Sequence, residues 1–235
     1  MVVAFGAHPD DVDLYAGGLM ASLARAGISV VIVDLTRGEL GTRGDPEHRA
    51  EEGREAARIL GAAARECLAL PDGALRGTDA PQTRAVVEAL RRHRPGLILA
   101  PHEVDTHPDH AEAARLVRRA RFFARLKHFA AAGEPCQPGP ILSYEQKVPF
   151  MPDLVVDIDA VYETKLAAVR AFRSQFFRDV GDDARTEISE PGFHEMLAAR
   201  ARLHGSRIGV KWGEGYQTEA PFAVHDPRFL LGRPE

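Results

Sequence analysis

Predominantly apolar segments alternate with amphipathic segments through the first half of the chain. Residues 2–7, 30–35, 67–70 and 97–100 read as short strands, most of them apolar on both faces. The segments between and after them have helical periodicity, and helices are expected at residues 17–27, 47–60, 82–93 and 108–126. This alternation predicts right-handed βαβ crossovers. The fold class is therefore α/β, a Rossmann-like, mainly parallel sheet with helices on both faces.

The pattern changes after residue 130, where the turn-rich stretch AAGEPCQPGP interrupts the alternation. Strands are expected at residues 141–144 and 154–158, and helices at 160–173 and 192–203. The segment 209–224 combines aromatic residues with glycines, which indicates a closing loop or hairpin. We expect one domain over residues 1–235, with a Rossmann-like core at 1–130 and a C-terminal extension at 131–235 that completes the site.

Composition narrows the class of protein. Hydrophobic residues make up 45% and charged residues 27% of the chain, which is ordinary for a globular protein. The formal net charge of -4 gives no basic field, so neither nucleic acid nor an anionic membrane surface is an expected partner. Two cysteines without a CxxC spacing, no basic leader and no apolar run near ~18 residues indicate a cytoplasmic protein.

Two polar clusters follow predicted strands. His8, Asp10 and Asp11 come directly after the first strand, and PHEVDTHPDH, residues 101–110, follows the strand at 97–100. Ligands of a parallel sheet bind outside the carboxyl ends of its strands. If these two strands are neighbours, both clusters meet in one crevice. Histidines and carboxylates together are typical ligands of a catalytic zinc ion with an open position for water.

Pro108 suits the first position of a helix, which places His107 at the cap and His110 in the first turn. The two imidazoles then point differently, so we predict His110 as a metal ligand and His107 in another role. Of the adjacent aspartates, one can bind the metal while its neighbour takes a proton from water. Motifs of serine hydrolases, phosphate loops, dinucleotide sites and HExxH zinc proteases are absent from the sequence.

These motifs resemble a known family. AHPDD at residues 7–11, TRGELGTRG at 36–44 and HPDH at 107–110 are similar to the motifs of LmbE-like, or PIG-L-type, N-acetylglucosaminyl deacetylases, and the resemblance spans essentially the whole chain. That family consists of zinc hydrolases with a Rossmann-like sheet. The resemblance implies that His8, Asp11 and His110 bind Zn²⁺, although such ligands also accept Fe²⁺ or Mn²⁺.

The resemblance also implies catalytic roles. Asp10 would be the general base that later protonates the leaving amine. His107 would polarise the amide carbonyl and stabilise the oxyanion, with Asp109 as its orienting partner. Arg49, in DPEHRAEE, matches an arginine that holds sugar hydroxyls.

Within the family, SQF at residues 174–176 and GVKWGEGY at 209–216 resemble the subgroup that deacetylates N-acetylglucosaminyl-malate during bacillithiol biosynthesis. On charge alone, Arg207 and Lys211 are candidate partners of the malate carboxylates. Several relatives have a tyrosine near the mouth of the active site where this chain has Phe193, and His194 is a candidate substitute.

Two alternatives remain open at this point. The substrate could be another amino sugar, such as a chito-oligosaccharide or an antibiotic precursor. Alternatively, the fold could be a sugar- or nucleotide-binding module with a structural metal, which would not need Asp10 as a base. The expected partner is a small-molecule glycoside, and because relatives often form trimers or hexamers we also expect a homo-oligomer.

Overall fold

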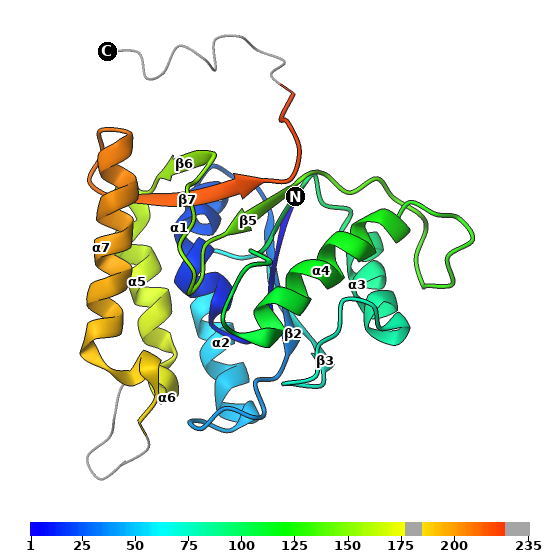
Figure 1. The fold of residues 1–235 in the computed structure, drawn as a ribbon, viewed down its shortest axis with the longest axis horizontal. Coiled ribbons are helices and arrows are strands. Elements are labelled where there is room, and N and C mark those ends of the chain that lie inside the picture. Colours follow the sequence, from blue (N-terminus) through cyan, green and yellow to red (C-terminus); the bar gives the residue numbers. More distant parts are fainter. Residues whose placement is uncertain (177–184, 224–235) are drawn as a thin grey trace.

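A single seven-stranded sheet forms the centre of the computed structural model, which describes residues 1–176 and 185–223 (Figure 1). The strand order is β3-β2-β1-β4-β5-β7-β6. The strands are β1 (Val2–Gly6), β2 (Val30–Thr36), β3 (Ala64–Leu70), β4 (Leu97–Pro101), β5 (Ile141–Tyr144), β6 (Leu154–Asp157) and β7 (Gly213–Thr218). The helices are α1 (Asp11–Arg25), α2 (Pro46–Leu60), α3 (Ala80–His93), α4 (Pro108–Phe123), α5 (Tyr162–Ala171), α6 (Arg173–Phe176) and α7 (Pro191–Arg207).

The first five strands are parallel and follow the order expected of a Rossmann-like sheet. β1 lies between β2 and β4, with Val2 opposite both Val30 and Leu97. The strand order reverses between β1 and β4, so a crevice opens at their carboxyl ends. The two polar clusters follow these two strands, and the predicted meeting point is confirmed.

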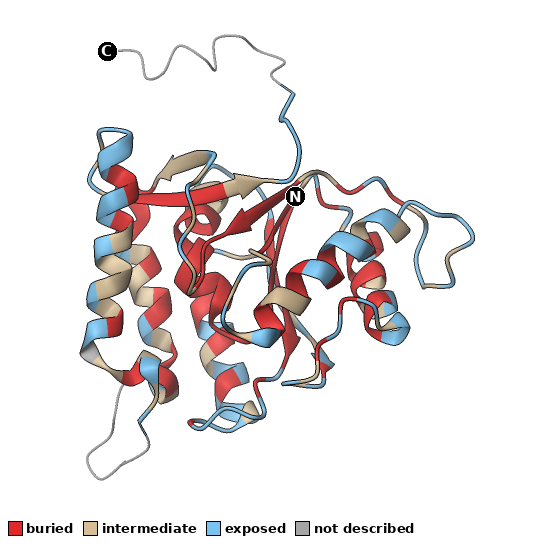
Figure 2. Cartoon of the chain, in the orientation of Figure 1, coloured by how far each residue is buried: buried red, intermediate tan, exposed pale blue. Residues whose placement is uncertain are grey.

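Helices cover both faces of the sheet, as predicted. Residues of β2 alternate between two buried clusters, with Val30 and Ile32 in one and Val31 and Val33 in the other. The first cluster includes residues of α1, α2 and α5, and the second includes residues of α3 and α4. Figure 2 shows the central strands and the inward sides of these helices as buried. The apolar runs form strands because both of their faces are covered.

The second half of the chain extends the same sheet. β5 continues the parallel order, whereas β7 runs antiparallel between β5 and β6. The closing segment predicted at 209–224 is thus the inserted strand β7, and Val224 lies outside the described residues. Among the described residues, no helix combines the length and apolar character needed to cross a bilayer.

The first helix differs from the prediction. It begins at Asp11, six residues before the expected start at residue 17, and therefore carries Asp11 in its first turn. Gly17 and Gly18 lie inside this helix, and both are buried where other elements pack closely. A Cβ at Gly18 would lie 2.7 Å from Glu214 Oε1, so this close approach explains the glycine inside the helix.

Candidate metal centre and active site

Three imidazoles converge at the carboxyl ends of β1 and β4. The ring centroids of His8 and His107 are 4.8 Å apart, those of His8 and His110 are 5.4 Å apart, and those of His107 and His110 are 4.5 Å apart. They border a cavity of about 430 Å³ that Asp10, Asp11 and Arg49 also line. The structure therefore brings together the predicted metal ligands and the predicted base.

Asp11 lies between two of these imidazoles. Its Oδ2 is 3.6 Å from His8 Nδ1, and its Oδ1 is 3.3 Å from His110 Nε2. The backbone N–H of His8 and Gln146 Nε2 each donate a hydrogen bond of 3.0 Å to this carboxylate. Burial alone would raise the pKa of Asp11, but the charge and hydrogen bonds of the histidines hold it well below its usual range. Asp11 is thus fixed as a carboxylate, the form that binds a cation.

The outer nitrogens of His8 and His110 are held by other carboxylates. His110 Nδ1 lies 3.1 Å from Asp105 Oδ1, while His8 Nε2 lies 3.1 Å from Asp72 and 3.5 Å from Asp109. Metal-binding histidines commonly give their outer N–H to a carboxylate, which leaves the inner nitrogen free for the ion. The donor set of His8, Asp11 and His110 therefore fits a divalent cation.

Among the described residues, two groups of three have ligand atoms close enough to share an ion, and neither group contains Asp11. These are His8, His107 and His110, and His8, Asp72 and Asp109. Geometry alone therefore does not separate His107 from the ligands. In the second triad the ligand atom of His8 would be its outer nitrogen, Nε2. Asp72 and Asp109 lie close to this nitrogen, and hydrogen bonding to it also explains their position.

Asp10 is the capping residue of α1 and has an unusual backbone. Its φ of 112° is in a region that residues other than glycine rarely adopt, and such backbone strain is common at functional sites. Burial raises the pKa of Asp10 to about 7, although Arg49, 3.4 Å from its Oδ2, opposes the rise. A carboxyl group with a pKa near neutrality is suited to proton transfer.

His107 caps α4, as predicted, and its Nδ1 accepts a hydrogen bond of 3.3 Å from the backbone N–H of Asp109. The neutral ring must then carry its proton on Nε2. Burial, together with the charge on His110, lowers the pKa of His107 and favours this neutral form. His107 can therefore donate a hydrogen bond.

The expected contact between His107 and the Asp109 carboxylate takes a different form. The carboxylate of Asp109 accepts hydrogen bonds from the backbone N–H groups of Gly73, at 2.7 Å, and Leu75, at 3.2 Å, and faces His8. The main chain of Asp109, rather than its side chain, orients His107. The helical start at Pro108 causes this arrangement, because it turns the two side chains in different directions.

Of the three predicted substrate-binding residues, only one lines the cavity. Arg49 lines the cavity but is buried, and its guanidinium donates hydrogen bonds to the carbonyl oxygens of Gly38 and Pro9. Arg207 and Lys211 are exposed and do not line the cavity. They lie at and beyond the end of α7, which runs away from the site for 17 residues, so their placement does not support a role in binding substrate there (Figure 1).

Phe193 and His194 do not line the cavity either. Both rings pack around Phe176, with centroid distances of 6.2 Å for Phe193 and 5.5 Å for His194. Among the described residues, the tyrosine that lines the cavity is Tyr15 of α1. Tyr15 is thus a residue of the cavity that no sequence motif indicated.

The structure adds Asp72, Asp105 and Gln146 to the predicted residues. Asp105 lies within the PHEVDTHPDH segment, where its position five residues before His110 was the available signal. Asp72 and Gln146 carry no comparable signal, because they are 64 residues from His8 and 135 residues from Asp11, their respective partners.

Comparisons with known proteins agree with this geometry. The sequence model of the PIG-L family, described as GlcNAc-PI de-N-acetylase, matches residues 3–121. Diacetylchitobiose deacetylase of Thermococcus kodakarensis is 34% identical, over 95% of this chain and 85% of the relative. A 4-oxalmesaconate hydratase of Pseudomonas putida is 28% identical, over 72% of this chain and 71% of the relative. The crystal structure of the conserved protein TT1542 from Thermus thermophilus superposes with a TM-score of 0.86 and 37% identity, covering 95% of this chain and 96% of that one. The chain belongs to the PIG-L family.

Proposed function

We propose that this protein hydrolyses the N-acetyl group of an N-acetylglucosaminyl conjugate and releases acetate and the free amine. The observation that carries the proposal is the placement of the buried Asp10 carboxyl group in the same cavity as His8, Asp11 and His110. The description of the family and the name of the Thermococcus relative both refer to deacetylation of N-acetylated sugars, which supports the proposal. A purely structural metal site would not need a carboxyl group poised for proton transfer.

His8, Asp11 and His110 would hold the metal, with zinc as the proposed ion and Fe²⁺ or Mn²⁺ as alternatives. When bound, a divalent cation would supply Lewis acidity toward water and toward the amide carbonyl. Asp105 and the pair Asp72 and Asp109 would keep the two histidines in the tautomers that binding requires.

Side chains of the protein would carry out the proton transfers and stabilise the developing charge. Asp10 takes a proton from the attacking water while the water oxygen bonds to the acetyl carbon. His107 donates a hydrogen bond from Nε2 to the carbonyl oxygen, where negative charge develops. Asp10 then returns the proton to the nitrogen as the carbon–nitrogen bond breaks, so acetate and an amine leave.

The finer substrate is proposed to be the malate glycoside, on the strength of the sequence resemblance at residues 174–176 and 209–216. The Thermococcus relative is named for a neutral disaccharide, which keeps a chito-oligosaccharide as the alternative. Both substrates present the same N-acetyl group to the site and differ in what is attached to the sugar.

Acetate release from a small panel tests the proposal. The metal-loaded protein is incubated with N-acetylglucosaminyl-malate, diacetylchitobiose and 4-oxalmesaconate, with and without prior chelation. We expect acetate from at least one glycoside, loss of activity on chelation and its return with Zn²⁺. Binding of a glycoside without acetate release would favour the binding module instead. Hydration of 4-oxalmesaconate with no deacetylation would contradict the proposal.

A further inference from the structure

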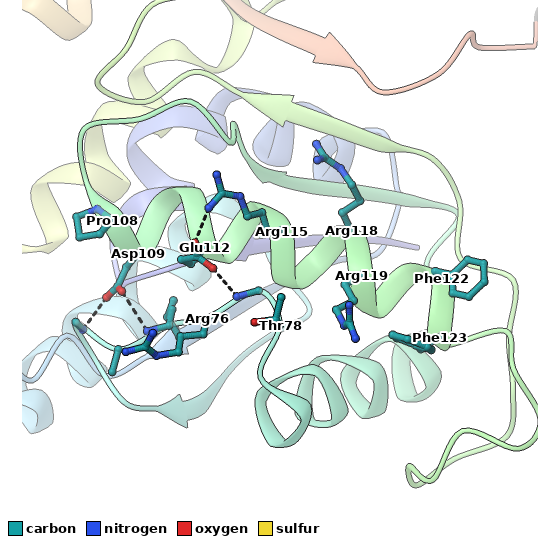
Figure 3. A pocket seen from close by; sticks show the side chains of 14 residues that line it. Arg76, Thr78, Pro108, Asp109, Glu112, Arg115, Arg118, Arg119, Phe122 and Phe123 are labelled. Carbon is teal, nitrogen blue, oxygen red and sulfur yellow. Dashed lines mark hydrogen bonds and ion pairs between the residues drawn. The ribbon is translucent and has the colours of Figure 1, made fainter.

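A second cavity lies beside the catalytic one, between the outer side of α4 and the loop that follows β3. It measures about 870 Å³ and is bordered by residues 73–78 on one side and by α4, from Pro108 to Phe123, on the other (Figure 3). We call this cavity the arginine groove, because Arg76, Arg115, Arg118 and Arg119 line it, against the carboxylates of Asp109 and Glu112. None of these arginines belongs to the proposed catalytic machinery.

The loop wall of the groove is held firmly in place. Asp109 accepts hydrogen bonds from the backbone of Gly73 and Leu75, and Glu112 accepts one of 2.5 Å from Gly77 N (Figure 3). Gln82 binds both the N–H of Arg76 and the carbonyl oxygen of Ala74. The groove is thus a preformed feature, and both of its carboxylates are already engaged by the protein.

The arginines divide into two pairs. Arg115 binds Glu112 at 2.5 Å, and Arg118 binds both Glu103 and Glu219. Arg76 and Arg119 are exposed and have no carboxylate partner among the residues that the structure describes. In Figure 3 the side chain of Arg119 lies between α4 and the loop, near Thr78, with its guanidinium 5.1 Å from the Phe123 ring centroid. Two cationic groups of the groove therefore remain available to an anion.

The groove adjoins the catalytic cavity. Gly73 and Pro108 line both, and Asp109, which borders the groove, lies 3.5 Å from His8. At a helical rise of ~1.5 Å per residue, Arg115 is about 8 Å and Arg119 about 14 Å along α4 from His110. A sugar bound with its acetyl group at the histidines could therefore extend its attached group toward the groove.

We propose that the arginine groove, through Arg76 and Arg119, binds an anionic group, a carboxylate or a phosphate, on the portion of the substrate attached to the sugar. This inference rests on the proposed function and narrows its substrate class to anionic conjugates. Guanidinium groups suit both anions, because their paired N–H donors match two oxygens of either. The proposal gives the substrate-binding role to these residues in place of Arg207 and Lys211.

The kinetic test uses the double variant Arg76→Gln/Arg119→Gln, with Arg125→Gln/Lys127→Gln as a control that removes two exposed charges just beyond α4. The substrates are N-acetylglucosaminyl-malate as the carboxylate, N-acetylglucosamine 1-phosphate as the phosphate and diacetylchitobiose as the neutral compound. We expect kcat/KM of the double variant to fall at least tenfold for one anionic substrate, mainly through KM, and to stay within twofold for diacetylchitobiose. An equal effect on all three substrates, or none on either anion, would overturn the proposal.

Calorimetric titration with succinate and with inorganic phosphate separates this inference from the activity itself. Wild type and the control should bind one of these anions, and the double variant should bind it at least tenfold more weakly, whether or not any substrate is deacetylated. Equal binding by all three proteins would refute the groove as an anion site. So would a change in oligomeric state of the double variant without a change in anion affinity, because the groove would then be a subunit interface.

Discussion

Replacing Asp105 by asparagine should weaken metal binding although the residue touches neither the proposed ion nor the substrate. Its Oδ1 accepts hydrogen bonds from His110 Nδ1, at 3.1 Å, and from the backbone N–H of His107, at 2.8 Å, while Oδ2 accepts from Lys147 N at 2.9 Å. Burial alone would raise the pKa of Asp105, but these hydrogen bonds and the charge on His110 lower it to about 2. The ionised form is therefore the one that the fold uses.

An asparagine has one oxygen, so its amide must face one of these two groups of donors. If the amide faces His110, Nδ1 must become an acceptor and the imidazole proton moves to Nε2, where it blocks the metal. If the amide faces Lys147, a buried backbone N–H loses its acceptor, at a cost of about 1–3 kcal/mol. Losing such an outer partner of a metal ligand typically lowers metal affinity by about 10–100-fold, or about 1.4–2.7 kcal/mol.

Competition with a zinc-binding dye measures this affinity in wild type and in Asp105→Asn. Asp153→Asn is the matched control, because the Asp153 carboxylate also accepts from a backbone N–H, that of Thr218 at 2.8 Å, but at the edge of β7. We expect the affinity of Asp105→Asn to fall at least tenfold and that of the control to stay within twofold. Unchanged zinc affinity in Asp105→Asn would refute the argument that this carboxylate fixes the tautomer of His110.

Three further outcomes follow from the geometry. In the metal-free protein the folded-state pKa of Asp10, about 7, exceeds the ordinary 3.8, so the free energy of unfolding should fall by about 2–3 kcal/mol as pH rises from 5 to 8. Thermal unfolding should show a smaller fall in Asp10→Asn. Gln146→Leu removes the donor to Asp11 and should weaken zinc binding about tenfold, with activity restored by excess zinc; no recovery would contradict a role confined to metal binding. Gly18→Ala should destabilise the protein by about 1–3 kcal/mol in denaturant unfolding, because its Cβ would meet Glu214, whereas a gain in stability would show that the helix and strand can move apart.

Much of the site could be predicted from local sequence because its chemistry is encoded in short motifs. His8, Asp10 and Asp11 occupy one strand end, and Pro108 determines how His107 and His110 are presented. The alternation of strands and helices predicted a mainly parallel sheet, and the structure adds that β1 and β4 are neighbours in it.

Other features depend on contacts between distant segments, which no local pattern reports. Asp72 reaches His8 from the turn after β3, and Gln146 reaches Asp11 from beyond β5. The glycine at position 18 of α1 is explained by Glu214, whose carboxylate accepts a hydrogen bond of 2.8 Å from Gly18 N across 196 positions of the chain. Charge alone likewise could not place Arg207, because its position is set by the direction of α7.

The division of labour between the two adjacent aspartates can be measured directly. Zinc content and acetate release are determined on the same preparation of Asp10→Asn, with His110→Ala beside it. If Asp11 binds the metal and Asp10 moves the proton, Asp10→Asn should keep about one zinc per chain while kcat falls about 10²–10⁴-fold, and His110→Ala should lose both. Turnover by Asp10→Asn at the wild-type rate, with its zinc in place, would contradict the account.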